Sequence, residues 1–181
     1  TTAIRKQGTG RWILSGANTF SGGTALEEGI LGLASPYVLG KGLLIVSGGS
    51  LENLYGAPLV VPGNLMQSWS GSFGVLGAYS VNLGSGSVAM TADLNLSVQV
   101  PSLEVAGDII GGWTLTKTGS GSLMLGGANQ LSGLNISGGV VAINRGDAAG
   151  SGPVTAAANT RLVVSTPVSV PQGLIHRWSF N

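Results

Sequence analysis

Acidic side chains are the first candidates for chemistry in this chain, because carboxyl groups serve as general acids, bases and nucleophiles. The chain has seven of them, and hydrolysis of a glycosidic bond needs two carboxyl groups about 5–10 Å apart. Asp93, Glu104 and Asp108 form the best cluster if their segments stack, whereas Glu27 and Glu28 would face opposite sides of a strand. The spacing does not demand convergence, so we expect solvated loop acids rather than a catalytic set.

Other reactive or metal-binding residue types are scarce. The sequence has one histidine, His176, and no cysteine, which excludes disulfides and thiolate metal sites. Glycine pairs such as Gly84-Ser-Gly86 lack the third glycine and the helix of a phosphate-binding loop. The repeated Gly-Gly-x-Gly-x-Asp of calcium-binding solenoids is missing as well. We therefore predict no enzyme, with no catalytic, metal-binding or cofactor-binding residues and no cofactor.

Aromatic side chains are the remaining candidates, because their faces could contact sugars. Trp69 and Trp113 stand in glycine- and serine-rich surroundings, SWSG and GGWT, and are the two candidate glycan contacts. The competing interpretation is that they fill corners of the core, since aromatic residues dominate packing.

The composition narrows the class of protein. Charged residues make up 8% of the chain, against about 25% in an ordinary soluble domain. Hydrophobic residues still reach 43%, so the 32 glycines do not indicate a disordered linker. The net charge is +1 and no basic cluster exceeds Arg5-Lys6, so we expect no nucleic-acid partner. No apolar run is long enough to span a bilayer as a helix, and we expect no membrane insertion.

An internal duplication runs along the chain. Residues 7–22 read QGTGRWILSGANTFSG and residues 118–133 read TGSGSLMLGGANQLSG, so that Gly8 aligns with Gly119. After one deletion the alignment resumes and pairs Leu26 with Ile136, so the two copies span 7–46 and 118–156. Apolar positions and turns keep register together, which identifies a repeat rather than shared low complexity.

The texture within each copy is short strands separated by turns. Residues 94–100 alternate apolar and polar types without a break, the pattern of a half-buried strand. No window shows a helical period, so helix should be negligible. Together with the duplication this predicts an all-β right-handed parallel β-helix, or β-solenoid, over residues 1–172. Three strands and three turns take roughly 20–25 residues per rung, giving about five rungs between the copies and about eight in all.

The Gly-Ala-Asn turns occur once in each copy. Asn18 and Asn129 should lie at corners, with Gly16 and Gly127 two positions before them. Two roles stay open for the asparagines. Their amides could stack into a ladder along the solenoid, or the residues could supply left-handed turn geometry.

The blocks Gly8 to Thr24 and Leu115 to Gly133 resemble the autotransporter-associated β-strand repeat, a pattern close to LTKTGTGTLTLSGANTYSGGT. The resemblance implies a right-handed β-helix in a secreted or outer-membrane-anchored bacterial passenger, without a conserved catalytic residue. After Gln172, residues 173–181 are a terminal strand or a linker toward another domain. Leu174 to Asn181 is similar to the first strand of laminin-G-like, concanavalin-type lectin domains.

These observations favour an extracellular, cell-surface structural module that acts as a spacer or self-associates, including into filaments. Solenoid end rungs expose unpaired strand edges, so they should continue into more chain or stack end to end in a homo-oligomer. The alternative is an adhesive module that binds surface glycans through Trp69 and Trp113. A polysaccharide-degrading β-helix built on Asp108 is a third hypothesis.

Overall fold

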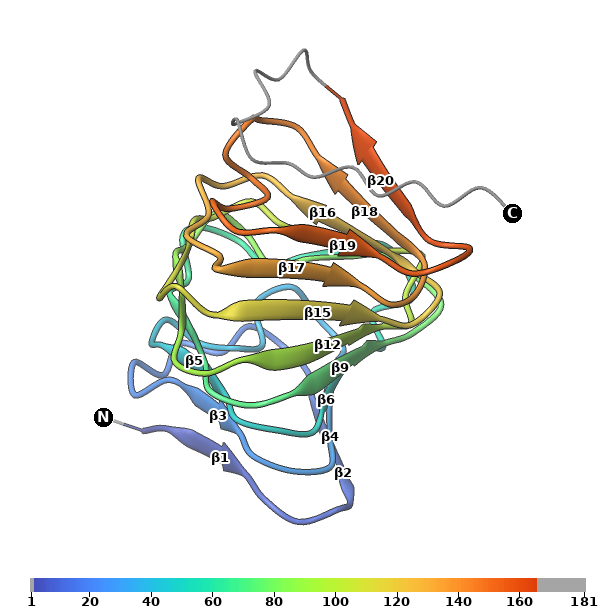
Figure 1. Ribbon diagram of the computed structural model, residues 1–181. Coiled ribbons are helices and arrows are strands. Elements are labelled where there is room, and N and C mark those ends of the chain that lie inside the picture. Colours follow the sequence, from blue (N-terminus) through green and yellow to red (C-terminus); the bar gives the residue numbers. More distant parts are fainter. Residues whose placement is uncertain (1, 166–181) are drawn as a thin grey trace.

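The chain is an all-β solenoid of about eight turns, seen in a computed structural model that describes residues 2–165. Every strand pair is parallel, and three sheets wind around one axis (Figure 1). No helix occurs within residues 2–165. The predicted fold class is therefore confirmed.

The three sheets are named here in the order in which the chain meets them. The first sheet contains β1 (Ile4–Lys6), β3 (Thr24–Leu26), β5 (Leu44–Val46), β8 (Gln67–Trp69), β11 (Val88–Met90) and β14 (Ile109–Ile110). The second contains β2 (Arg11–Leu14), β4 (Ile30–Leu33), β6 (Ser50–Asn53), β9 (Phe73–Leu76), β12 (Leu94–Val98), β15 (Thr114–Thr118), β17 (Gly133–Ile136) and β19 (Val154–Ala156). The third contains β7 (Leu59–Val60), β10 (Val81–Asn82), β13 (Ser102–Val105), β16 (Ser122–Leu125), β18 (Val140–Ile143) and β20 (Arg161–Val164).

The core is a set of apolar columns that run along the solenoid axis. Alternate residues of each strand point inward, and the parallel register places each on its equivalent in the next rung. Leu31, Leu51 and Val75 form one such column on the second sheet, and all three are buried. Burying apolar area in this way stabilises by about 25 cal/mol per Å². Each rung therefore depends on the rungs above and below it.

The duplicated copies lie on different faces of the solenoid. Register carries Ile4 through five rungs to Ile109 on the first sheet. The alignment of the two copies, however, carries Lys6, on β1 of the first sheet, to Lys117, on β15 of the second. The copies are thus separated by five rungs and one further face, not by about five rungs alone.

The rungs of the duplicated copies also differ from the predicted three-strand rung, because a loop replaces one strand. We call residues 15–23 and 34–43 the first loop face; it takes the place of the third sheet below β7. Residues 126–132 and 144–153 are the second loop face, which takes the place of the first sheet above β14. The central rungs, from β5 to β16, have all three strands.

Candidate functional site

Two lysines occupy inward positions in the core columns. Lys117 lies on β15 between Leu96 of β12 and Ile136 of β17, and its side chain is fully buried. Its Nζ donates to the carbonyl oxygens of Thr118 and Gly119 at 2.9 and 2.8 Å. It also donates to a carbonyl of the next rung, that of Gly138, at 2.8 Å. One ammonium thereby fastens two successive corners.

Lys6 repeats this arrangement in the first copy. Its Nζ donates to the carbonyl oxygens of Gln7, Gly8 and Glu28, the positions equivalent to those around Lys117. Lys6 is also fully buried, although it lies on the outermost described rung. Its Nζ lies 5.8 Å from the centroid of the Trp12 ring, within range of a cation–π contact. The same local sequence therefore builds the same corner on two different faces.

Burial opposes the charge of Lys117. Loss of solvent lowers the pKa of its ammonium to about 8, because the charged form is disfavoured away from water. The three carbonyl oxygens partly offset this, since each accepts a charge-assisted hydrogen bond. The corner is a structural anchor, and no second titratable group lies among its hydrogen-bond partners in the described chain.

The two motif asparagines bridge rungs through the backbone. Asn18 Nδ2 donates to the carbonyl of Val38 at 2.8 Å, and Asn129 Nδ2 donates to that of Ala148 at 2.6 Å. Neither residue has a positive φ; Asn159 is the one non-glycine residue in that region within the described range. Neither side chain bonds another amide side chain there. Both proposed roles, amide ladder and left-handed turn, are therefore wrong.

The glycines of the same turns serve different needs. Gly16 has a φ of +81°, which suits glycine, and a Cβ there would meet nothing within 4 Å. Gly127 has no positive φ, but a Cβ would lie 2.6 Å from the Cα of Asp108 in the rung below. Close approach of two backbones requires glycine at this second position.

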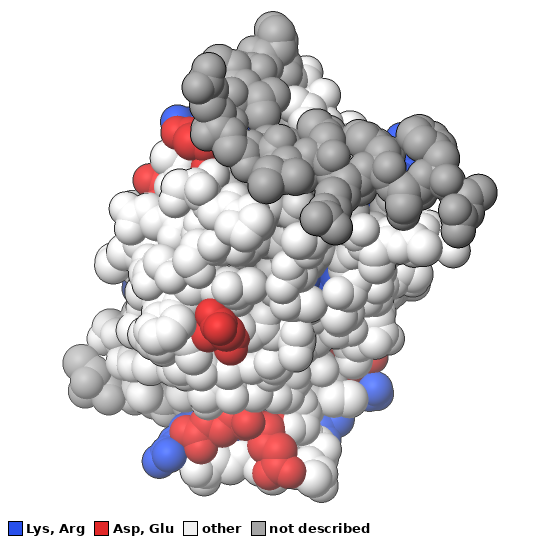
Figure 2. Space-filling view, in the orientation of Figure 1, with Lys and Arg blue, Asp and Glu red and all other residues white. Residues whose placement is uncertain are grey.

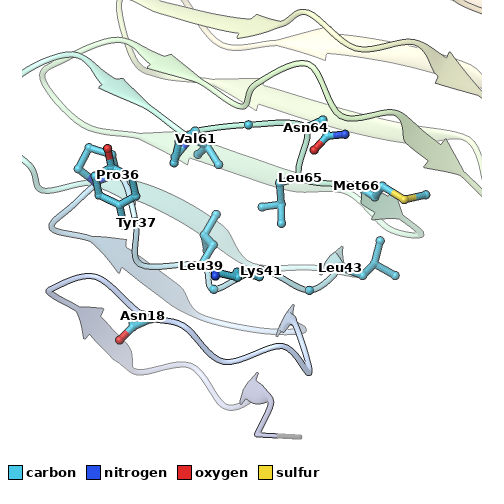
Figure 3. Close-up of a pocket in the computed structure, with 14 residues that line it drawn as sticks. Asn18, Pro36, Tyr37, Leu39, Lys41, Leu43, Val61, Asn64, Leu65 and Met66 are labelled. Carbon is cyan, nitrogen blue, oxygen red and sulfur yellow. The ribbon is translucent and has the colours of Figure 1, made fainter.

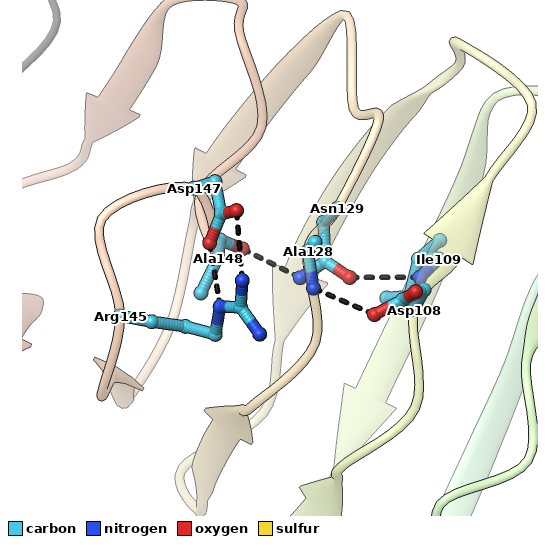
Figure 4. Close-up of polar contacts among 7 residues, drawn as sticks. All are labelled: Asp108, Ile109, Ala128, Asn129, Arg145, Asp147 and Ala148. Carbon is cyan, nitrogen blue, oxygen red and sulfur yellow. Dashed lines mark hydrogen bonds and ion pairs between the residues drawn. The ribbon is translucent and has the colours of Figure 1, made fainter.

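The second loop face is joined to the strands below it by polar contacts (Figure 4). Asn129 Oδ1 accepts from the N–H of Ile109 at 2.8 Å, and Asp108 Oδ1 accepts from the N–H of Ala128 at 2.7 Å. The N–H of Gln130 donates to the carbonyl of Ile109 at 2.7 Å. These contacts close the free edge of β14.

The first loop face is not joined to the strands above it. Within the described part of the chain, no backbone hydrogen bond connects residues 36–42 to residues 57–65. β7 is the edge strand of the third sheet, and its Leu59 and the following Val61 donate their N–H groups to the side of β10. Alternation along a strand turns the N–H of Val60 toward the first loop face instead.

A hollow of about 710 Å³ lies at this open junction, between residues 36–43 and 61–66 (Figure 3). Its walls are mainly apolar, with Leu43 and Met66 exposed at one end. Tyr37, Lys41 and Asn64 are its exposed polar side chains, and no acidic residue lines it. None of these three side chains has a polar partner among the described residues.

The predicted aromatic contacts separate into one buried and one exposed residue. Trp69 is 0% exposed, and its ring packs edge-on against Phe73 with centroids 5.1 Å apart. It occupies an inward position between Val46 and Met90, so the proposed glycan contact at Trp69 is wrong, and the competing interpretation that this residue fills the core is confirmed. Trp113 is 40% exposed, in the turn before β15.

The best carboxylate cluster of the sequence does not form. Asp93, Glu104 and Asp108 lie at three different sides of one rung: before β12, on β13 and before β14. Each carboxylate already accepts a hydrogen bond from a neighbouring rung. Asp93 accepts from the N–H of Thr114, and Glu104 accepts from the Nδ2 of Asn82, both at 2.7 Å. The three acids therefore provide no pair of carboxyls across a common substrate position.

Charged side chains lie mainly toward the two ends of the solenoid, and much of the face in Figure 2 is uncharged. Near the first rung, Arg5 pairs with Glu27 and Arg11 pairs with Glu52. Residues 2–165 contain no group of three or more acidic or histidine side chains suited to a metal ion. Residues 2–165 also contain no helix that is long and apolar enough to cross a membrane.

Some of the predictions fall on residues outside the described range. His176 and the lectin-like segment of residues 174–181 lie there. Within the described range, sequence reasoning missed Lys6 and Lys117. The signal was available, because both lysines stand at the same place in the two aligned copies.

A family model for the passenger-associated-transport-repeat matches residues 4–33 and residues 115–143. The matched segments include both buried lysines and both motif asparagines. They coincide with the start of each copy of the duplication. No curated protein and no solved structure matches the chain.

Proposed function

Since the chain is a passenger-type β-helix repeat protein, we propose that it serves as a structural module of a secreted or cell-surface protein, extending or self-associating by adding rungs. One observation carries the proposal: a single core runs through about eight turns, and polar side chains fasten successive rungs instead of forming a reactive site. The matched family is a passenger repeat and not an enzyme family.

The first described rung supports growth by stacking. β1 and β2 are edge strands, so one side of each has no strand partner in the described chain. Trp12 points inward at the start of the column that continues with Leu31, yet it is 48% exposed. A further rung would cover its ring. That rung could come from a preceding segment of a longer chain or from a second copy.

Sedimentation velocity of the isolated chain over a wide concentration range tests self-association. We expect end-to-end oligomers to grow with concentration, because a second copy covers Trp12 and pairs the open edge. Trp12→Lys should abolish the growth, while Trp113→Lys, a similarly exposed control, should not. A chain that stays monomeric throughout contradicts self-association and leaves only the spacer role.

A glycan-binding adhesive role is the second candidate, and the exposed ring of Trp113 is the observation in its favour. It predicts saturable glycan binding that Trp113→Ala removes. The polysaccharide-degrading alternative has no comparable support, because its three acids lie on different sides of the rung.

A further inference from the structure

We propose that the hollow below β7 is a binding site for a negatively charged sugar, such as a uronic or sialic acid unit of a glycan. This inference goes beyond the structural role and does not depend on it. The hollow exists because the first loop face and β7 share no backbone hydrogen bonds in the described chain. Its volume of about 710 Å³ is within the range of sites for small ligands.

The charge of the hollow selects the ligand. Lys41 is the one charged residue among the described residues that line it, and no acid of the described chain pairs with it. An ammonium with no partner favours an anionic group, and a carboxylate on a sugar ring supplies one. A neutral sugar would offer Lys41 hydroxyl acceptors but no opposite charge.

The aromatic and amide groups fit the rest of a sugar ring. Tyr37 is 58% exposed and lies at the end of the hollow away from Leu43 and Met66 in Figure 3, with Lys41 between them. Its ring offers an apolar face with a polar edge. Asn64 contributes an amide with two donors and one acceptor oxygen for ring hydroxyls. Because Leu59 and Val61 donate to the side of β10, alternation along the strand directs the N–H of Val60 toward the same junction.

The backbone segments on both sides of the hollow, the first loop face and β7, are held by hydrogen bonds to neighbouring rungs. Asn18 holds the first loop face, because its N–H donates to the carbonyl of Tyr37 and its Nδ2 donates to that of Val38. β7 is held by β10 from above. The site therefore needs no large rearrangement to receive a ligand.

Titration with trigalacturonate, followed by amide chemical shifts and calorimetry, tests the site, with neutral maltotriose as the matched probe. We expect saturable trigalacturonate binding centred on residues 36–43 and 60–66. Lys41→Gln should weaken it about 10-fold or more, and Tyr37→Ala about 5-fold. The controls Arg161→Gln and Tyr79→Ala, a cation and an exposed ring outside the hollow, should leave it unchanged. A second titration with sialyllactose distinguishes the two sources of sugar carboxylate.

Several outcomes would overturn the proposal. These are no saturable binding of either acidic sugar, equal binding of maltotriose, or equal loss in Lys41→Gln and Arg161→Gln. Equal binding of a Glu-Glu dipeptide would show that the charge alone is recognised and would overturn the assignment to a sugar. Sedimentation is measured independently, so failure here leaves the structural proposal standing.

Discussion

The two loop faces come from the same repeat, but the junction between loop and strand is closed on one and open on the other. At the second loop face, Asn129 accepts from the N–H of Ile109 on β14, and Asp108, just before β14, accepts from the N–H of Ala128. At the first, residues 36–42 face β7 without a backbone hydrogen bond in the described chain, and a hollow remains. The closed junction lies below the second loop face, between it and β14. The open junction lies above the first loop face, between it and β7.

This difference shows that the motif asparagine acts in both directions when rungs lie on both sides of it. Asn129 accepts from the rung below through Oδ1 and donates to the rung above through Nδ2. Asn18 lies on the first described rung and its side chain makes only the upper contact there. The described loop of residues 34–43 has no such residue facing β7, so that junction stays open.

Substitution of the two buried lysines should cause the largest losses in the free energy of unfolding. Lys117→Met keeps most of the side-chain volume but removes the donor to three carbonyl oxygens in the middle of the stack. We expect a loss of about 2–4 kcal/mol in the free energy of unfolding. Lys6→Met, on the outermost described rung, should cost about half as much. Urea unfolding measures both, and equal costs would contradict the expectation that a lysine on the outermost described rung contributes less to stability than one in the middle of the stack.

A smaller effect should separate the two asparagines. Asn129→Ala removes two hydrogen bonds from a buried amide and should cost about 2 kcal/mol in the free energy of unfolding. Asn18→Ala removes one bond from a half-buried amide and should cost about 1 kcal/mol or less. Asn64→Ala is the control, since its side chain has no partner in the described structure. Thermal and urea unfolding of the three variants gives the order, and a larger cost at Asn18 would refute the account of the junctions.

The pH dependence of stability should show the burial of Lys117. Its pKa is about 8 in the folded chain, against the ordinary lysine value of 10.5 in the unfolded chain. Between these values the unfolded state binds more protons, so this group makes the free energy of unfolding rise with pH. The free energy of unfolding of the wild type should therefore rise relative to that of Lys117→Met as the pH is raised from about 8 to about 10. A difference that is flat or falls contradicts a lowered pKa.

The fold was predictable from sequence because strand alternation and the duplicated turns are local signals. The face on which each copy lies was not predictable, since rung length varies. The rung from Ile4 to Thr24 is shorter than the rung from Leu44 to Gln67, and such differences accumulate along the chain.

The sequence left the position of Trp69 open, because its Ser-Gly surroundings suggested a surface turn while its aromatic side chain favoured the core. The alternation of Gln67 and Trp69 around Ser68 was the better guide, since both flanking residues point inward.

The hollow could not be predicted, because it depends on contacts between segments that are well separated in the sequence. Tyr37, Lys41 and Asn64 form no motif. They share a surface only because a loop face ends below the edge strand β7.

Amide hydrogen exchange under native conditions tests the difference between the junctions most directly. The N–H groups of Ile109, Ala128 and Gln130 are bonded across the closed junction and should exchange slowly. The N–H of Val60, directed at the open junction, should exchange orders of magnitude faster than those of its neighbours Leu59 and Val61, which are bonded to the third sheet. Equal protection of Val60 and Ile109 would contradict the account, because it would mean that both junctions are closed.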